Sequence, residues 1–291
     1  MAASARAGQL GNASKGPGLK SGYAPLDGLK LYYEIHGVGA PLIVMHGGLG
    51  SIEMFGATLP ALASGRQVIA VDLQAHGRTA DIERPLSLDA MAEDIAALLK
   101  YLQIEKPEVM GYSLGAGVAL RLTVNHPGVV RKLVVVSTPY KRDGWYPEVR
   151  AAMAQIGPEL ADQMRLSPLY QQYAKVAPRP GDWPVLVTKV GKLVNTEYDW
   201  TPDVAAIKVP TMIVFGDADA VQPQHIVEFF QLLGGGKRDG GWDGSGISNA
   251  RLAILPGVTH YNIAESAPLV PTVAPFLDAA MAEGGGARSS C

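Results

Sequence analysis

The sequence is most informative at residues 107–120, which read Pro-Glu-Val-Met-Gly-Tyr-Ser-Leu-Gly-Ala-Gly-Val-Ala-Leu. A short apolar run reaches Met110, the pattern Gly-x-Ser-x-Gly occupies 111–115, and a small, apolar, helix-forming run follows. This order predicts a strand, a sharp turn and a helix, with the hydroxyl of Ser113 raised above the end of a sheet. Glycines at 111 and 115 leave room where a Cβ would meet neighbouring backbone. We therefore predict that Ser113 is a nucleophile, the alternative being a chance match in a chain with 34 glycines.

Predicted strands alternate with predicted helices on both sides of this turn. Buried strands are expected at 67–73, 107–112, 131–137, 210–215 and 251–255, and helices at 51–63, 88–102, 114–126, 224–233 and 267–282. Such alternation predicts an α/β fold in which helices flank a mostly parallel sheet, with ligands bound beyond the carboxyl ends of the strands. The β-rich runs 29–35 and 41–45 are expected to form an antiparallel pair that opens the sheet.

Residues 139–207 interrupt the alternation with helical patches, such as 147–156, and no predicted strand. This segment contains eight of the 20 aromatic residues, which predicts a helical cap whose rings line an apolar pocket or pack the cap onto the body. The candidate wall residues of the pocket are Trp145 in the cap and Leu49 and Tyr112 in the body. The expected organisation is a flexible leader at 1–22, a core at 23–138 and 208–282, and a flexible tail at 283–291. The glycine-rich stretch 234–249 is expected to be a flexible loop.

Composition excludes several classes of function. The net charge of -2 gives no field to attract nucleic acid or an anionic membrane. No apolar run is long enough for a membrane span, and residues 1–22 lack the apolar core of a signal peptide. A cytoplasmic protein is expected, although a trimmed secreted protein would have a similar sequence. Cys291 is the only cysteine, so an internal disulfide is impossible, and nothing indicates the oligomeric state.

A serine nucleophile needs a base, an acid that orients the base, and donors for the oxyanion. Of six histidines, only His260 follows the last predicted strand, as the chain order of this architecture requires. Asp217 and Asp219 both follow the strand at 210–215 and are the candidate acids.

The oxyanion donors are expected to be two backbone N–H groups. Leu114 supplies one because it follows the nucleophile, and the turn at 46–50, His-Gly-Gly-Leu-Gly, supplies the other. Gly48 is the choice there, with Leu49 as the alternative. This turn lacks the Lys-Ser/Thr ending of a phosphate-binding loop, and no His/Cys/Asp cluster has zinc-ligand spacing, so neither a metal nor a cofactor is predicted.

From about Tyr23 to Met281 the chain resembles the α/β-hydrolase superfamily. The resemblance rests on five motifs in order: residues 46–50, residues 71–79 (Val-Asp-Leu-Gln-Ala-His-Gly-Arg-Thr), residues 111–115, Gly-Asp-Ala-Asp at 216–219 and Gly-Val-Thr-His at 257–260. The family spacing Gly-x-x-Asp implies that Asp219 is the acid and Asp217 the reserve. Members usually carry Arg-Gly where Gln74-Ala75 stands, on a loop outside the triad. A serine at 113 argues against the dehalogenases and epoxide hydrolases of this fold, which use aspartate.

The resemblance implies a serine hydrolase that cleaves carboxylic esters of small or medium acyl groups through an acyl-enzyme on Ser113. Lactonase activity, for instance on acyl-homoserine lactones, is the first alternative, followed by C–C hydrolysis and perhydrolysis. A small-molecule receptor without turnover is the alternative from a different class, although such proteins usually lack a member of the triad. The expected partner is a small ester or lactone, with no nucleic acid and no membrane.

Overall fold

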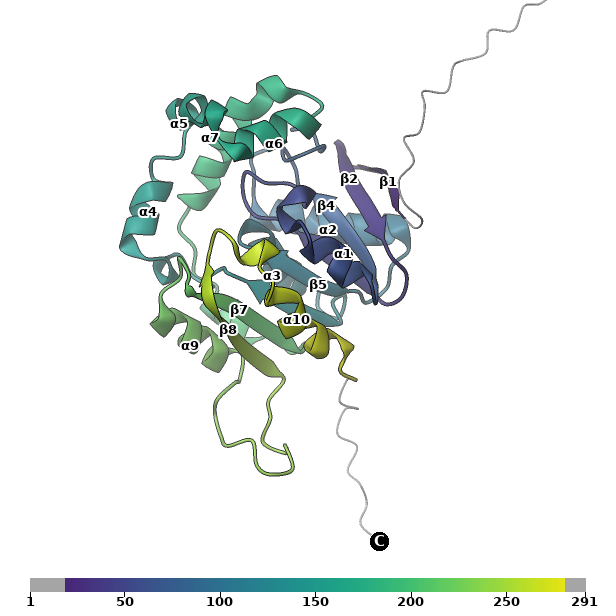
Figure 1. The fold of residues 1–291 in the computed structure, drawn as a ribbon, viewed down its shortest axis with the longest axis vertical. Helices are drawn as coiled ribbons and strands as arrows, with labels where there is room; N and C mark the ends of the chain where they lie inside the picture. The colour runs from purple at the N-terminus through teal and green to yellow at the C-terminus, as the bar shows by residue number, and fades with distance from the viewer. Residues whose placement is uncertain (1–18, 281–291) are drawn as a thin grey trace, which may run out of the picture.

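The computed structural model describes residues 19–280, in which eight strands form one sheet (Figure 1). The strands are β1 (Lys20–Leu26), β2 (Leu29–His36), β3 (Pro41–Met45), β4 (Gln67–Asp72), β5 (Glu108–Tyr112), β6 (Lys132–Val136), β7 (Thr211–Ala218) and β8 (Ala250–Thr259). Their spatial order is β1-β2-β4-β3-β5-β6-β7-β8. The β1–β2 and β2–β4 pairs are antiparallel, and every pair from β4 to β8 is parallel. The expected mostly parallel sheet is therefore confirmed.

Two expectations for the beginning of the chain are wrong. Residues 20–22, assigned to the leader, belong to β1, which pairs over its whole length with residues 29–35 of β2. The predicted antiparallel pairing of 29–35 with 41–45 does not occur, because β4 lies between β2 and β3. The connection at 37–40 is short enough for a hairpin, but β3 is almost entirely buried and pairs with parallel strands on both sides. The rest of the predicted leader and the predicted tail lie outside the described residues.

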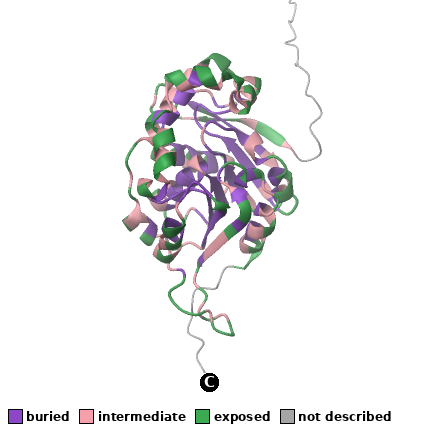
Figure 2. Ribbon diagram, turned by 60° about the vertical axis from the view of Figure 1, so that its left-hand side comes forward, coloured by how far each residue is buried: buried purple, intermediate pink, exposed green. Residues whose placement is uncertain are grey.

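Helices cover both faces of the sheet. Because successive strand residues point to opposite faces, Ile43 and Met45 pack into one hydrophobic cluster, while Leu42 and Val44 pack into another. The first cluster includes α2 (Leu88–Leu102), α3 (Leu114–Asn125) and α9 (Pro223–Leu232), and the second includes α1 (Thr58–Ala63) and α10 (Leu269–Asp278). Figure 2 shows the buried strands between helices whose outer surfaces are exposed. The helix expected at 51–63 is divided into the 3-10 helix η1 (Ile52–Phe55) and α1.

The helix α2 is placed by its N-cap and its apolar stripe. The Ser87 hydroxyl accepts a hydrogen bond from the backbone N–H of Ala90 at 3.4 Å, which satisfies a free donor of the first turn. Met91, Ile95 and Leu98 recur at helical spacing and are buried. This packing directs the N-terminus of α2 toward the carboxyl ends of the strands, where the cavity described below lies.

The cap, residues 139–207, is helical and contains no strand. Its helices are α4 (Pro147–Met153), α5 (Pro158–Gln163), α6 (Pro168–Val176), α7 (Trp183–Val194) and α8 (Thr201–Ala205), with the 3-10 helices η2 (Arg142–Gly144), η3 (Met164–Leu166) and η4 (Pro180–Asp182). Each α-helix has a proline in its first turn, where a missing N–H costs nothing. Figure 1 shows α5, α6 and α7 gathered at one end of the molecule, beyond the sheet.

The two ends of the cap lie side by side. Lys141 and Asp199 form an isolated antiparallel bridge, and the backbone N–H of Trp200 donates to the carbonyl of Tyr140 at 3.0 Å. We call these two paired segments, residues 140–141 and 199–200, the neck of the cap. Main-chain hydrogen bonds thus close the cap on itself where it joins the body.

His225 in α9 fixes the start of the cap. Its Nε2 accepts a hydrogen bond from the backbone N–H of Tyr140 at 3.2 Å, and the two rings stack with centroids 4.2 Å apart. Burial lowers the pKa of His225 to about 4, so the ring is neutral near pH 7 and its Nε2 lone pair is free to accept.

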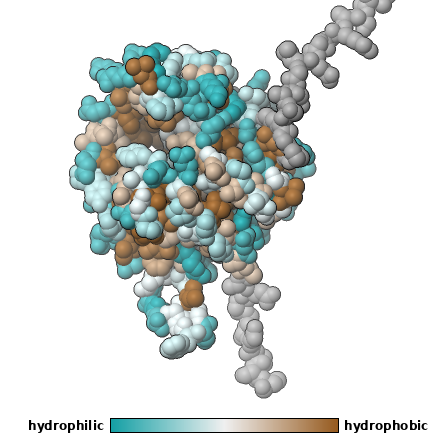
Figure 3. Space-filling view, viewed as in Figure 1, coloured by the Kyte–Doolittle hydropathy of each residue, from teal (hydrophilic) through white to brown (hydrophobic). Residues whose placement is uncertain are grey.

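The loop at 234–249 separates α9 from β8, as expected from its glycines. Figures 1 and 3 show it projecting from the end of the molecule opposite the cap. Trp242 on this loop is fully exposed. The loop is therefore remote from the carboxyl ends of the strands.

Candidate active site

Ser113 stands at a strained turn between β5 and α3. Its backbone has φ 52° and ψ -115°, a conformation that residues other than glycine rarely adopt. Its N–H donates to the carbonyl of Val136 in the adjacent strand at 2.9 Å, which holds the turn against the sheet. A Cβ at Gly115 would lie 2.4 Å from the carbonyl oxygen of Met45, and one at Gly111 would lie 2.1 Å from that of Gly115. The glycines are therefore required by close backbone contacts.

His260 follows β8 and faces Ser113. Its Nε2 lies 3.2 Å from the Ser113 Oγ, within hydrogen-bond reach. The imidazole has Tyr112 on one side and Trp145 on another, with ring centroids 5.5 Å and 5.4 Å away. The Tyr112 hydroxyl also donates to the backbone carbonyl of His260 at 2.7 Å. These contacts fix the position of the ring beside the serine.

Asp219 lies on the other side of His260, at the turn after β7. Its Oδ1 is 3.3 Å from the His260 Nδ1. The carboxylate is buried, and its Oδ2 accepts from the backbone N–H of Gly216 at 3.1 Å and from the Ser137 hydroxyl at 2.5 Å. Burial alone would raise the pKa of Asp219, but the hydrogen bond and charge of His260, together with these other donors, hold that pKa below its ordinary value. The carboxylate is thus ionised and oriented toward the histidine.

Asp217, the reserve acid, has a different place. It is exposed, and its Oδ1 accepts from the backbone N–H groups of Gly257 and Val258 at 2.8 Å and 3.3 Å. It therefore binds the end of β8, just before His260, and does not face the imidazole.

Ser137 belongs to the site but was not predicted from the sequence. It follows the buried strand β6 and has φ 51°, so a second strained serine lies at the carboxyl edge beside Ser113. Its hydroxyl is one of the donors to Asp219. A polar residue directly after four buried apolar positions, 133–136, was the available signal.

The two predicted oxyanion donors lie together. Gly48 and Leu114 both line the cavity that contains Ser113, and neither backbone N–H has an acceptor among the described residues. His46 anchors the turn: its Nδ1 donates to the carbonyl of Gly47 at 2.7 Å, and its Nε2 accepts from the N–H of Leu73 at 3.1 Å. Burial lowers the pKa of His46 to about 4, which keeps this ring neutral.

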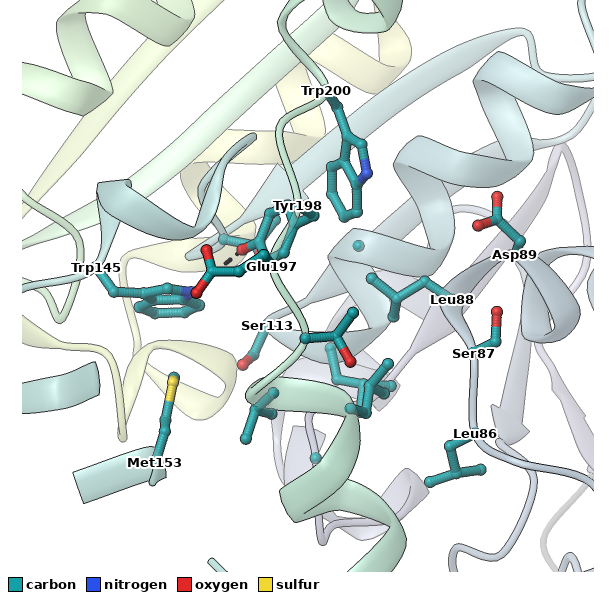
Figure 4. Close-up of a pocket in the computed structure, with 17 residues that line it drawn as sticks. Leu86, Ser87, Leu88, Asp89, Ser113, Trp145, Met153, Glu197, Tyr198 and Trp200 are labelled. Carbon is teal, nitrogen blue, oxygen red and sulfur yellow. Dashed lines mark hydrogen bonds between the residues drawn. The ribbon is translucent and has the colours of Figure 1, made fainter. Parts of the chain in front are cut away.

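A cavity of about 470 Å³ opens beside Ser113 (Figure 4). Its walls come from the end of β3, the start of α2, the start of α3 and the cap, and its volume suits a small-molecule ligand. The lining residues are Gly48, Leu86, Ser87, Leu88, Asp89, Ser113, Leu114, Gly117, Thr138, Trp145, Met153, Leu193, Val194, Thr196, Glu197, Tyr198 and Trp200.

Only Trp145 of the three predicted wall residues lines this cavity. Tyr112 is wrong as a wall residue because it packs with Val44 and Met110 in the cluster on the α1 and α10 face, behind His260. Leu49 is also wrong, since it is buried in the core with a left-handed φ of 59°. Of the eight cap aromatics, Trp145, Tyr198 and Trp200 line the cavity, whereas others, such as Trp183, pack within the core.

Gln74 and Ala75 stand where members of the resembled superfamily usually carry Arg-Gly, and local hydrogen bonds hold Gln74 in place. The Gln74 Oε1 accepts from the Arg84 Nε at 2.8 Å, and its Nε2 donates to Asp81 Oδ1 at 3.1 Å. Ala75 adopts φ 67°, a conformation in which the usual glycine would be unstrained. The side chain of Gln74 therefore ties this loop to residues 81 and 84.

Within residues 19–280, no group of three or more His, Cys, Asp or Glu side chains is placed to hold a metal. In the same range, no helix is both long and apolar enough to cross a bilayer.

Comparison with known proteins gives consistent matches. Residues 40–238 match the model of the alpha/beta hydrolase fold family. The chain is 29% identical to a putative carbamate hydrolase of Azorhizobium caulinodans, over 67% of this chain and 80% of that protein. It is 28% identical to a non-heme haloperoxidase of Rhodococcus erythropolis, over 80% of this chain and 90% of that protein. The structure of a thermophilic esterase from Thermogutta terrifontis aligns with a TM-score of 0.67 at 20% identity, covering 89% of this chain and 97% of the other.

Proposed function

The chain belongs to the α/β-hydrolase family, and on that basis we propose that it hydrolyses carboxylic esters of small or medium acyl groups through an acyl-enzyme on Ser113. One observation supports the proposal above all. The Ser113 Oγ lies 3.2 Å from His260 Nε2, and His260 Nδ1 lies 3.3 Å from the buried Asp219 carboxylate, beside two N–H groups that have no acceptor among the described residues. Nucleophilic catalysis at a carbonyl needs this set of groups.

In the proposed reaction, the Ser113 Oγ attacks the ester carbonyl while His260 Nε2 takes its proton. Asp219 holds the Nδ1–H tautomer of His260 and stabilises the imidazolium. The negative oxygen of the tetrahedral intermediate accepts from the N–H groups of Gly48 and Leu114. His260 returns the proton to the departing alcohol oxygen, and water, activated by the same histidine, then releases the acid from Ser113.

The first test compares wild type with Ser113→Ala on p-nitrophenyl butyrate and on esters of longer chain. Ser113→Ala should lose at least about 1000-fold in kcat, because the nucleophile is removed. Ser64→Ala is the matched control, since Ser64 is exposed and its hydroxyl only donates to the carbonyl of Ala61. Full activity of Ser113→Ala would refute the proposal.

The same groups could open a cyclic ester, so the panel includes an acyl-homoserine lactone and an aryl carbamate. Faster ring opening than hydrolysis of every linear ester would replace the proposal by a lactonase. Labelling of Ser113 by a fluorophosphonate without turnover of any substrate would favour C–C hydrolysis, perhydrolysis or a receptor. A cytoplasmic location remains a prediction. So does the expectation that the protein binds a small molecule and neither nucleic acid nor a membrane.

A further inference from the structure

The charged residues around the cavity are unevenly distributed. Among the described residues that line it, only Asp89 and Glu197 are ionic, and both are acidic. Figure 4 shows Glu197 beside Trp145 and Asp89 on the opposite side of the pocket, with Ser113 between them in this view. The rest of the lining is largely aliphatic and aromatic. A substrate in this cavity therefore meets carboxylates, apolar groups and a few hydroxyl groups, but no cation among the described lining residues.

The arginines that pair with these carboxylates do not line the cavity. Asp89 Oδ1 accepts from the Arg121 Nε at 2.6 Å, and Glu197 Oε1 accepts from the Arg142 Nη1 at 2.8 Å. Arg121 is shared with a further carboxylate, Asp203, at 2.6 Å, so this group of three keeps a net negative charge. The positive charges are thus engaged behind the wall.

Two lysines lie close by, on a separate cavity. Lys189 and Lys192 line it, and its boundary with the first cavity is formed by the shared residues Leu86, Leu193 and Thr196. Lys189 is already bound to the Asp81 Oδ2 at 2.6 Å. The N-terminus of α2 also reaches the first cavity, but the carboxylate of Asp89 in its first turn already complements the positive end of the helix dipole.

We propose that this cavity selects esters that are neutral or cationic and discriminates against esters that carry a carboxylate on the acyl chain. An anion that enters this cavity loses much of its hydration and finds hydroxyl groups but no cationic partner in return. A cation loses hydration too, but the carboxylates of Asp89 and Glu197 attract it. The inference rests on the proposed esterase function and adds the charge class of its substrates.

The test uses three p-nitrophenyl esters of matched chain length: the hexanoate, the mono-adipate and the 5-(trimethylammonio)pentanoate. Each kcat/KM is divided by the rate of spontaneous hydrolysis, which removes differences in intrinsic reactivity. The adipate should be at least about 30-fold poorer than the hexanoate, from the uncompensated desolvation of its carboxylate. The cationic ester should match the hexanoate within about 3-fold or exceed it.

Variants of Glu197 locate the effect. The side chains of Glu197 and Asp89 are 77% and 56% exposed, so solvent screens them and single changes should be modest. Glu197→Gln should raise the adipate-to-hexanoate ratio about 3-fold, and Glu197→Lys about 10-fold. Glu159→Gln, on an exposed residue of α5 that does not line the cavity, should leave the ratio unchanged.

The possible failures are distinguishable. A wild-type ratio within 3-fold of unity, or a ratio that Glu197→Lys does not move, overturns the charge inference but leaves the esterase. Preference for the adipate that is lost in Lys192→Gln would also overturn it, because the neighbouring cavity would then hold the anion. If no ester is turned over, the esterase proposal fails. The charge inference is then decided by the rates at which neutral and carboxylate-bearing alkyl fluorophosphonates label Ser113.

Discussion

Replacing Ser137 by alanine tests how Asp219, the proposed acid, is held. The hydroxyl donates to the Asp219 Oδ2 at 2.5 Å, and a hydrogen bond to a charged group contributes roughly 1.5–3 kcal/mol. The carboxylate keeps the N–H donors of Gly216 at 3.1 Å and Val221 at 3.3 Å. We therefore expect the free energy of unfolding to fall by about 2 kcal/mol. We also expect kcat/KM to fall about 10-fold, because Asp219 orients His260 less well.

The pH dependence of this loss follows from the pKa of Asp219, which lies below its ordinary value of 3.8 in the folded protein. Ionisation therefore stabilises the fold above that pH, and this contribution is lost as the pH falls through the folded pKa. Ser137→Ala moves the folded pKa upward. The difference in unfolding free energy between wild type and variant should consequently be constant from pH 8 to pH 5 and should shrink below about pH 4.

Ser137→Gly provides the matched comparison. It removes the same donor, but it also relieves the left-handed backbone at φ 51°. It should thus be about 1 kcal/mol more stable than Ser137→Ala while losing the same activity. The measurements are urea unfolding at pH 5 and pH 8, and kcat/KM on p-nitrophenyl butyrate. If both variants kept wild-type activity, or if the loss of stability grew toward acid pH, the reasoning would be refuted.

Three further predictions concern stability and the loop before the base. The pKa of His225 is about 4 in the folded state and 6.5 in the unfolded state, so the unfolded state binds more protons between these values. The free energy of unfolding should therefore fall as the pH drops from 6.5 to 4, by up to about 1.4 kcal/mol per pH unit. His225→Gln should show a flatter slope in urea titrations. Gly115→Ala should abolish soluble folded protein or activity, whereas Gly65→Ala, where an added Cβ meets no atom within 4 Å, should keep the wild-type Tm. Asp217→Ala should lower kcat about 3- to 10-fold by releasing the backbone before His260, with fluorophosphonate labelling of the serine slowed in parallel; unchanged labelling would contradict this role.

Local sequence patterns were sufficient for much of the fold. The turn at Ser113 was predictable because its strand, glycines and helix are contiguous, and each element carries its own apolar pattern. The position of His260 beside Ser113 was predictable because this histidine follows the last strand. These features depend on short stretches of chain and on a fixed order of elements.

The errors concern pairings between distant segments. The position of β4 between β2 and β3 is set by pairing between strands that are distant in the sequence. The short connection between β2 and β3 by itself favoured a hairpin. Ser137 could be assigned to Asp219 only once β6 and β7 were known to be neighbours. Alternate residues of a strand point to the same face, so Tyr112 points with Met110 to the face of the sheet opposite α3. The prediction overlooked this alternation because Tyr112 precedes Ser113 directly in the sequence.

The neck of the cap has a consequence for how the enzyme can diversify. Main-chain hydrogen bonds join its two segments, and these bonds do not depend on the side chains between them. Residues 142–198 therefore form a cassette with adjacent ends, which can be lengthened, shortened or exchanged for the corresponding segment of a relative at little cost in loop-closure entropy. Ser113, Asp219 and His260 all lie outside this cassette. Grafting a new segment can thus change the lining of the cavity while these three residues stay in place, provided that the contact of Trp145 with the His260 ring is kept.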